Sequence, residues 1–142
     1  MKMACVSREQ LFAAFHANPP ANPEAVAQCL SRLKFRPPGD CVRFLLEMNG
    51  GAGFIGKNFL TAWPVEELIS TNQELTDGDP VPELFLFGSD GGGEGFAFDT
   101  RSLPASIVVV PLIISLEDAV PLVANFDAFL QRLYHSESLF FP

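Results

Sequence analysis

The chain has 142 residues, of which 48% are hydrophobic and 18% are charged. That length fits a single domain (residues 1–142) with one hydrophobic core, and the composition excludes a disordered chain. The longest apolar run, Ile107–Ile114, is far too short to span a bilayer, so no membrane partner is expected. The first residues hold no sustained apolar segment, so we expect no secretory signal and a cytoplasmic location.

The formal net charge of −8 is distributed unevenly along the chain. Residues 1–57 carry a balance of +3, whereas residues 58–142 carry −11. An acidic half repels nucleic acid phosphates and attracts a basic partner. Acidic surfaces also keep proteins in solution, and composition does not separate these two roles. The sequence therefore predicts no nucleic acid partner and leaves a basic protein partner open.

The three cysteines are Cys5, Cys29 and Cys41, an odd number at wide spacing. Without a leader this pattern indicates free thiols in a reducing cytoplasm. Cys29 and Cys41 fall on apolar helix faces, so they are interpreted as small core residues rather than catalytic thiols.

The first expected element is a short helix. Ser7 can cap it, with Gln10 as the partner three residues on. Leu11, Ala14 and Phe15 are then expected on its inner face.

Two amphipathic helices are expected next. Asn22 as a cap and Pro23 in the first turn start one that runs through Leu33. Apolar residues at helical spacing predict the other from about Pro38 to Met48. Asn49-Gly50-Gly51 comes next, and glycine there tolerates the left-handed conformation that ends helices.

Strands dominate the rest of the chain. The expected elements are one or two strands within 52–63 with a turn near 56–58, a helix from Pro64, a loop over 76–83, strands at 84–87, 95–99 and 106–110, another strand around 121–123, and a helix capped by Asn125. This order predicts an α+β fold in which helices cover one face of a mostly antiparallel sheet.

Residues 84–100, "LFLFGSDGGGEGFAFDT", are the most distinctive stretch. A phosphate site is disfavoured because the glycines lead into a strand-like alternation, and Asp90 and Glu94 would repel the anion. A calcium loop is a fairer rival, although the spacing is not that of an EF-hand. The favoured interpretation is a hairpin turn shaped by Gly88, Gly91, Gly92 and Gly93, with Asp90 supporting it through its side chain.

Residues for catalysis or metal binding are sparse. His16 and His135 are the only histidines, no Gly-x-Ser-x-Gly motif occurs, and metal-ligand types are not clustered. A triad assembled in space remains open, because triads are defined by geometry. We predict no catalytic residue, no metal, no cofactor and no enzymatic activity; a calcium-dependent binder or an enzyme is the least favoured hypothesis.

The order of these motifs resembles the SMI1/KNR4 (SUKH) superfamily over about residues 22–134. Residues 38–51, "PGDCVRFLLEMNGG", match its proline-led helix followed by Asn-Gly-Gly, although Cys41 stands where an aromatic residue is usual. The family's Glu-Leu…Asn helix is matched by Glu67, Leu68 and Asn72. Its glycine hallmark is matched by residues 87–94 together with Asp99. A Val108–Val110 strand and a closing helix at 125–133 complete the resemblance.

The resemblance implies a non-catalytic α+β scaffold. Many bacterial members of the family are immunity proteins that bind and neutralise a toxin, and fungal relatives are interaction proteins. We therefore expect neutralisation of a basic toxin, for example a nuclease, by direct binding; the alternative is a regulatory or scaffolding module without a toxin partner. A monomer or weak homodimer is expected. The family supplies no universal binding residue.

Six acids in or beside loops of the acidic half are the candidate protein-binding residues. Opposite charge speeds encounter with a basic partner and favours one register of binding. These acids are Asp77, Asp79, Glu83, Asp90, Glu94 and Asp99. The competing interpretation is that the hallmark acids only hold the turn.

Overall fold

The structure is a computed structural model that describes residues 5–75, 82–112 and 116–136. The helices are α1 (Arg8–Leu11), α2 (Pro23–Arg32), α3 (Gly39–Glu47), α4 (Val65–Leu75), the 3-10 helix η1 (Leu116–Asp118) and α5 (Phe126–His135). The strands are β1 (Ala14–Ala17), β2 (Gly51–Ile55), β3 (Asn58–Ala62), β4 (Leu84–Ser89), β5 (Glu94–Asp99), β6 (Ser106–Pro111) and β7 (Val120–Val123).

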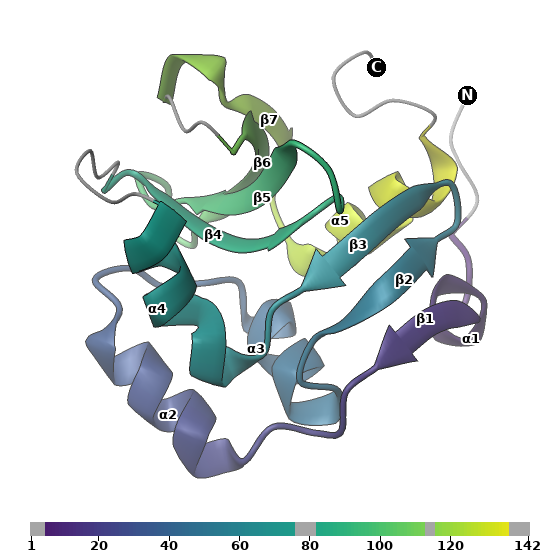
Figure 1. Cartoon of the computed structure of the whole chain (residues 1–142), viewed down its shortest axis with the longest axis horizontal. Coiled ribbons are helices and arrows are strands. Elements are labelled where there is room, and N and C mark those ends of the chain that lie inside the picture. Colours follow the sequence, from purple (N-terminus) through teal and green to yellow (C-terminus); the bar gives the residue numbers. More distant parts are fainter. Residues whose placement is uncertain (1–4, 76–81, 113–115, 137–142) are drawn as a thin grey trace.

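The strands form one seven-stranded sheet in the order β1 to β7, and every neighbouring pair is antiparallel. Each strand therefore pairs with the strand next to it in the chain. The sheet is strongly twisted, with β1–β3 and β4–β7 forming two wings in Figure 1. Helices and an antiparallel sheet confirm the predicted α+β class.

The α-helices cover one face of this sheet, here called the inner face, whereas Leu116 of η1 packs against a second buried cluster on β4–β6 that includes Leu86 and Val108. Phe87, Phe96 and Phe98 of β4 and β5 pack on the inner face against Phe126 and Phe129 of α5. The Phe87 and Phe129 rings meet edge to face with centroids 5.3 Å apart, and the Phe96 and Phe129 centroids are 5.0 Å apart. Such offset and edge-to-face pairs add to the free energy gained by burial. The many phenylalanines of the sequence thus form the core where α5 crosses the sheet.

The first helix is shorter than predicted, and this part of the prediction was wrong. The predicted capping box of Ser7 and Gln10 is present, but α1 ends at Leu11. Ala14 and Phe15 belong to β1, which pairs with β2 at the edge of the sheet. Gly53 permits this pairing, because a Cβ there would lie 2.4 Å from the Ala14 carbonyl oxygen. Backbone pairing with a strand distant in sequence outweighs the local helical spacing.

The two wings of the sheet meet at a short seam. β3 pairs with β4 at only two positions, Thr61 with Ser89 and Ala62 with Gly88. A Cβ on Gly88 would lie 2.5 Å from the Thr61 carbonyl oxygen, so this approach requires glycine. Beyond the seam β3 diverges from β4, and α4 lies beside β4 instead (Figure 1).

Asn72 of α4 takes the place of the missing strand partner. Its Oδ1 accepts a hydrogen bond from the Leu86 N–H at 2.8 Å, and its Nδ2 donates to the Leu86 carbonyl at 2.8 Å. The same Nδ2 also donates to the Leu68 carbonyl within α4 at 2.8 Å. One side-chain amide therefore satisfies both backbone groups of a fully buried strand residue.

Replacing Asn72 with alanine should destabilise the protein by about 2–4 kcal/mol, because two buried backbone groups lose their hydrogen-bond partners. The measurement is the free energy of unfolding in urea. Gln73→Ala is the matched control, since Gln73 is an exposed neighbour on α4 and its loss should cost less than about 0.5 kcal/mol. Equal stability of the two variants would contradict the bridging role of Asn72.

Candidate protein-binding surface

The glycine-rich stretch forms the predicted hairpin turn between β4 and β5. Asp90 Oδ1 accepts hydrogen bonds from the backbone N–H of Gly92 at 2.8 Å and of Glu94 at 3.3 Å. Gly91 has a φ of +81°, a conformation that favours glycine. A Cβ on Gly93 would meet nothing within 4 Å, so the space around this position does not require glycine. The carboxylate is thus engaged by the turn itself.

The structure does not bring the candidate acids that it describes together. Asp77 and Asp79 lie outside the described residues. Asp90 and Glu94 lie at the turn end of the hairpin, whereas Glu83 and Asp99 lie at its open end. The six residues of β4 separate the two ends by roughly 20 Å at the usual rise of a strand. One compact partner contact does not span both groups unless the partner follows the whole strand.

The acids at the open end are compensated. Arg101 donates through Nε to Asp99 Oδ1 at 2.9 Å and through a terminal nitrogen to Oδ2 at 2.7 Å. The hydrogen bond from the Arg101 side chain lowers the pKa of the Asp99 carboxyl, against the effect of partial burial. The pKa of Arg101 is raised, mainly by its hydrogen bond to Asp99, and the charge of Glu83 adds to this rise. This end of the hairpin therefore offers a basic partner less negative charge than the sequence indicates.

At the turn end of the hairpin, the environment of Glu94 disfavours its negative charge. Desolvation raises the pKa of Glu94, and the charge of Asp90 raises it further. Among the described residues, no hydrogen-bond partner reaches the buried Oε2 of Glu94. Because a cation would relieve both effects, this end of the hairpin suits a basic group of a partner better than the open end does.

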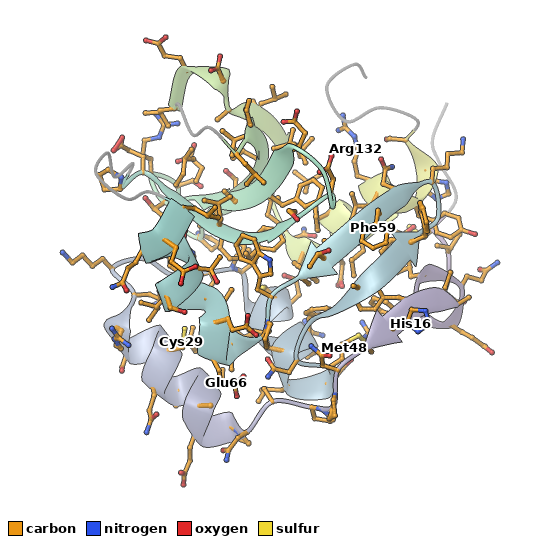
Figure 2. The ribbon with its side chains drawn as sticks, in the orientation of Figure 1. His16, Cys29, Met48, Phe59, Glu66 and Arg132 are labelled. Carbon is orange, nitrogen blue, oxygen red and sulfur yellow. The ribbon has the colours of Figure 1, made fainter. Side chains whose placement is uncertain are left out.

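An aromatic pair lies beside this turn, and sequence reasoning missed it. Phe54 of β2 and Phe59 of β3 are cross-strand partners on the outer face, opposite the helices, with ring centroids 5.3 Å apart at 89°. Phe54 is 52% exposed. A Cβ on Gly91 would lie 3.0 Å from the Phe59 ring, so the turn packs directly against Phe59. Figure 2 labels Phe59 on β3. Alternation along 52–61 contained a signal for this face, since Ala52, Phe54, Phe59 and Thr61 share it.

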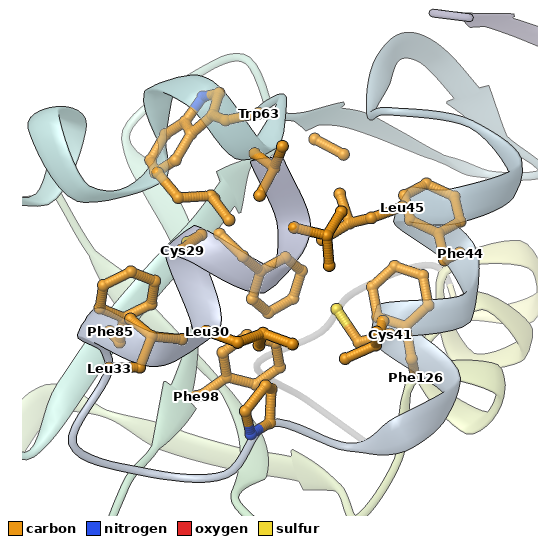
Figure 3. A pocket seen from close by; sticks show the side chains of 17 residues that line it. Cys29, Leu30, Leu33, Cys41, Phe44, Leu45, Trp63, Phe85, Phe98 and Phe126 are labelled. Atoms are coloured by element: carbon orange, nitrogen blue, oxygen red, sulfur yellow. The ribbon is translucent and has the colours of Figure 1, made fainter. Parts of the chain in front are cut away.

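The two cysteines predicted to lie in the core are buried there. They line an apolar cavity of about 30 Å³ between α2, α3, α4 and the sheet (Figure 3). Burial raises the pKa of both thiols, which opposes formation of the reactive thiolate. The lining offers almost no polar group to fix a ligand, so the cavity is a packing gap rather than a binding site.

The histidines lie on different elements of the fold. His16 lies in β1 and His135 is the last residue of α5. Within the described ranges no group of three His, Cys, Asp or Glu side chains is placed to hold a metal ion. In the same ranges no helix has the length and apolar character needed to cross a membrane.

The two ends of the hairpin should respond to pH with opposite sign. The pKa of Glu94 is raised in the folded state, so its charged form destabilises the fold above the ordinary pKa of 4.5. Glu94→Gln should therefore stabilise the protein at pH 7, by less than about 1 kcal/mol because the side chain is only partly buried, and this gain should vanish near pH 3.

The pKa of Asp99 is lowered, so its charge stabilises the fold above the ordinary value of 3.8 and this contribution is lost as pH falls. Arg101→Gln should therefore destabilise at pH 7 and have little effect near pH 2. Urea unfolding between pH 2 and pH 8 measures both variants. A loss of stability in Glu94→Gln at pH 7 would contradict the assignment.

Comparison with known proteins identifies the family of this chain. No curated protein matches the chain at a significant level. The sequence profile of the SMI1 / KNR4 family (SUKH-1) matches residues 20–132, two residues earlier at each end than the motifs that carry the resemblance. The matched region contains α3 with the Asn-Gly-Gly that follows it, the Asn72 bridge and the glycine hairpin. The chain belongs to the SMI1/KNR4 family (SUKH-1).

Proposed function

We propose that this protein is a non-catalytic immunity protein that neutralises a cognate toxin by binding it directly. Membership of the family supports the proposal, because its members include immunity-type domains. The observation that carries the proposal is that the polar residues of the matched motifs form hydrogen bonds to backbone groups of the chain itself. Asn72 and Asp90 bond to backbone groups of this chain, and Asn49 Oδ1 accepts from the Val65 N–H at 2.8 Å.

These motif residues hold the scaffold together, which leaves exposed surface to determine the partner. We propose that the partner contacts the turn end of the hairpin and the aromatic pair beside it. Phe54 provides an exposed aromatic anchor, the kind of residue that dominates binding energy at interfaces. Asp90 and Glu94 provide negative charge at its rim, which favours a partner with a basic rim around an apolar contact.

The first test is capture of partners by the tagged protein from its native cells, at low and at high salt. We expect one dominant basic protein, whose expression alone arrests growth and whose co-expression with this chain restores it. The association rate of the purified pair should fall as salt rises. Several weak partners, or a captured protein that is harmless alone, would favour a regulatory or scaffolding role instead.

Phe54→Ala should weaken binding of the captured partner at least tenfold with little change in stability, because the side chain is half exposed. Leu46→Ala is the matched control: Leu46 is 40% exposed and lies on α3, away from this face. Isothermal titration calorimetry measures both. Equal affinities for the two variants would exclude the aromatic face as the contact, while leaving toxin neutralisation itself to be judged by the growth assay.

A further inference from the structure

A basic connector lies at the other end of the hairpin. After α2 ends at Arg32, the chain runs without regular structure to α3, and its residues alternate in character. Leu33, Phe35 and Pro37 are half-buried; Phe35 packs on Phe85 of β4 with ring centroids 5.3 Å apart. Arg32, Lys34 and Arg36 are exposed.

The three cations form no ion pair with any described residue. They stand out in a protein with a net charge of −8, where acidic partners for them would be abundant. The acids nearest in the hairpin, Glu83 and Asp99, interact with Arg101 instead. The connector therefore presents uncompensated positive charge to solvent.

A hollow of about 380 Å³ lies beside this connector. Its lining joins Arg32 and Lys34 to Ile69 of α4 and to Leu84 and Phe85 of β4. A lining that combines apolar side chains with two exposed cations suits an extended segment that carries both apolar and acidic side chains.

A strand edge also faces this hollow. Backbone groups of successive strand residues point to opposite edges, and Leu86 points its N–H and C=O towards α4. Leu84, two residues earlier, therefore points the same way. Glu83 faces the other edge, where its carbonyl accepts a hydrogen bond from the N–H of Thr100, the residue after β5. No described residue pairs with the backbone of Leu84 on the α4 side.

We propose that this hollow, here called the Leu84 groove, binds an extended acidic segment of a partner protein. The segment adds to β4 at Leu84 through backbone hydrogen bonds, and its acidic side chains pair with Arg32 and Lys34. Single-stranded nucleic acid fits less well, since the net charge of −8 repels phosphates and no exposed aromatic ring among the described residues offers stacking here. The inference does not rest on toxin neutralisation and concerns a different surface.

The probe is a fluorescent, capped six-residue peptide that alternates glutamate and valine, measured by anisotropy and by amide chemical shifts. We expect binding that weakens with salt and shifts the amide signals of Leu84 and Lys34. Arg32→Gln combined with Lys34→Gln should weaken binding about tenfold. Arg43→Gln, an exposed cation on α3 outside the groove, is the control and should change affinity less than about twofold.

Two N-methylated isomers of the peptide test the strand addition. Methyl groups on alternate amides block one edge of the peptide, so one isomer should lose binding about fivefold and the other should retain it. Equal affinities of the isomers, equal effects of the charge variants, or no binding at millimolar peptide would overturn the proposal. Tighter binding of a six-nucleotide oligothymidine than of the peptide would replace it with a nucleic acid site.

Discussion

The rest of the structure depends on side chains that bond to backbone groups at the ends of helices and where α4 lies against β4. Packing a helix against a strand leaves backbone groups without regular partners, and burial makes each of them costly. Four side chains solve this problem at different junctions: Asn72 at Leu86, Asn49 at Val65, Asn58 at the carbonyls of Leu133 and Ser136, and Asp40 at the N–H groups of Phe126 and Asp127. They fix where α4 and α5 lie, and the phenylalanine core then fills the space between the helices and the sheet.

This use of polar residues separates the scaffold from the surface. Asp90 is one of the candidate binding acids, and its carboxylate accepts two backbone hydrogen bonds in the turn, the role that its sequence pattern predicts. The turn in turn packs against Phe59, which places an exposed aromatic ring next to the remaining charge. The bonds that shape the hairpin thus also place Gly91 against the Phe59 ring.

Local sequence was a good guide wherever local interactions decide structure. Helix caps such as Asn22 and Asn125, the amphipathic helices and the glycine hairpin are present as predicted. Prediction failed at Ala14 and Phe15, where pairing with the distant strand β2 determines the backbone conformation. It also missed that Phe54 and Phe59 share an outer face, because this depends on the register of β2 and β3. The grouping of Glu83 with Asp90 overlooked that the strand between them holds them apart. The bridge made by Asn72 depends on α4 and β4 together, so no single segment reveals it.

The same bridge limits what can join the sheet at β4. On one side of Leu84, the amide of Asn72 occupies both backbone groups of Leu86. On the other side Pro82 has no N–H to donate. The Thr100 hydroxyl lies 3.3 Å from the Pro82 carbonyl and 3.0 Å from the Glu83 carbonyl. The open stretch of edge is thus one residue long. A chain that docks there gains a single pair of backbone bonds, so the edge is closed to the repetitive strand stacking that leads to aggregation.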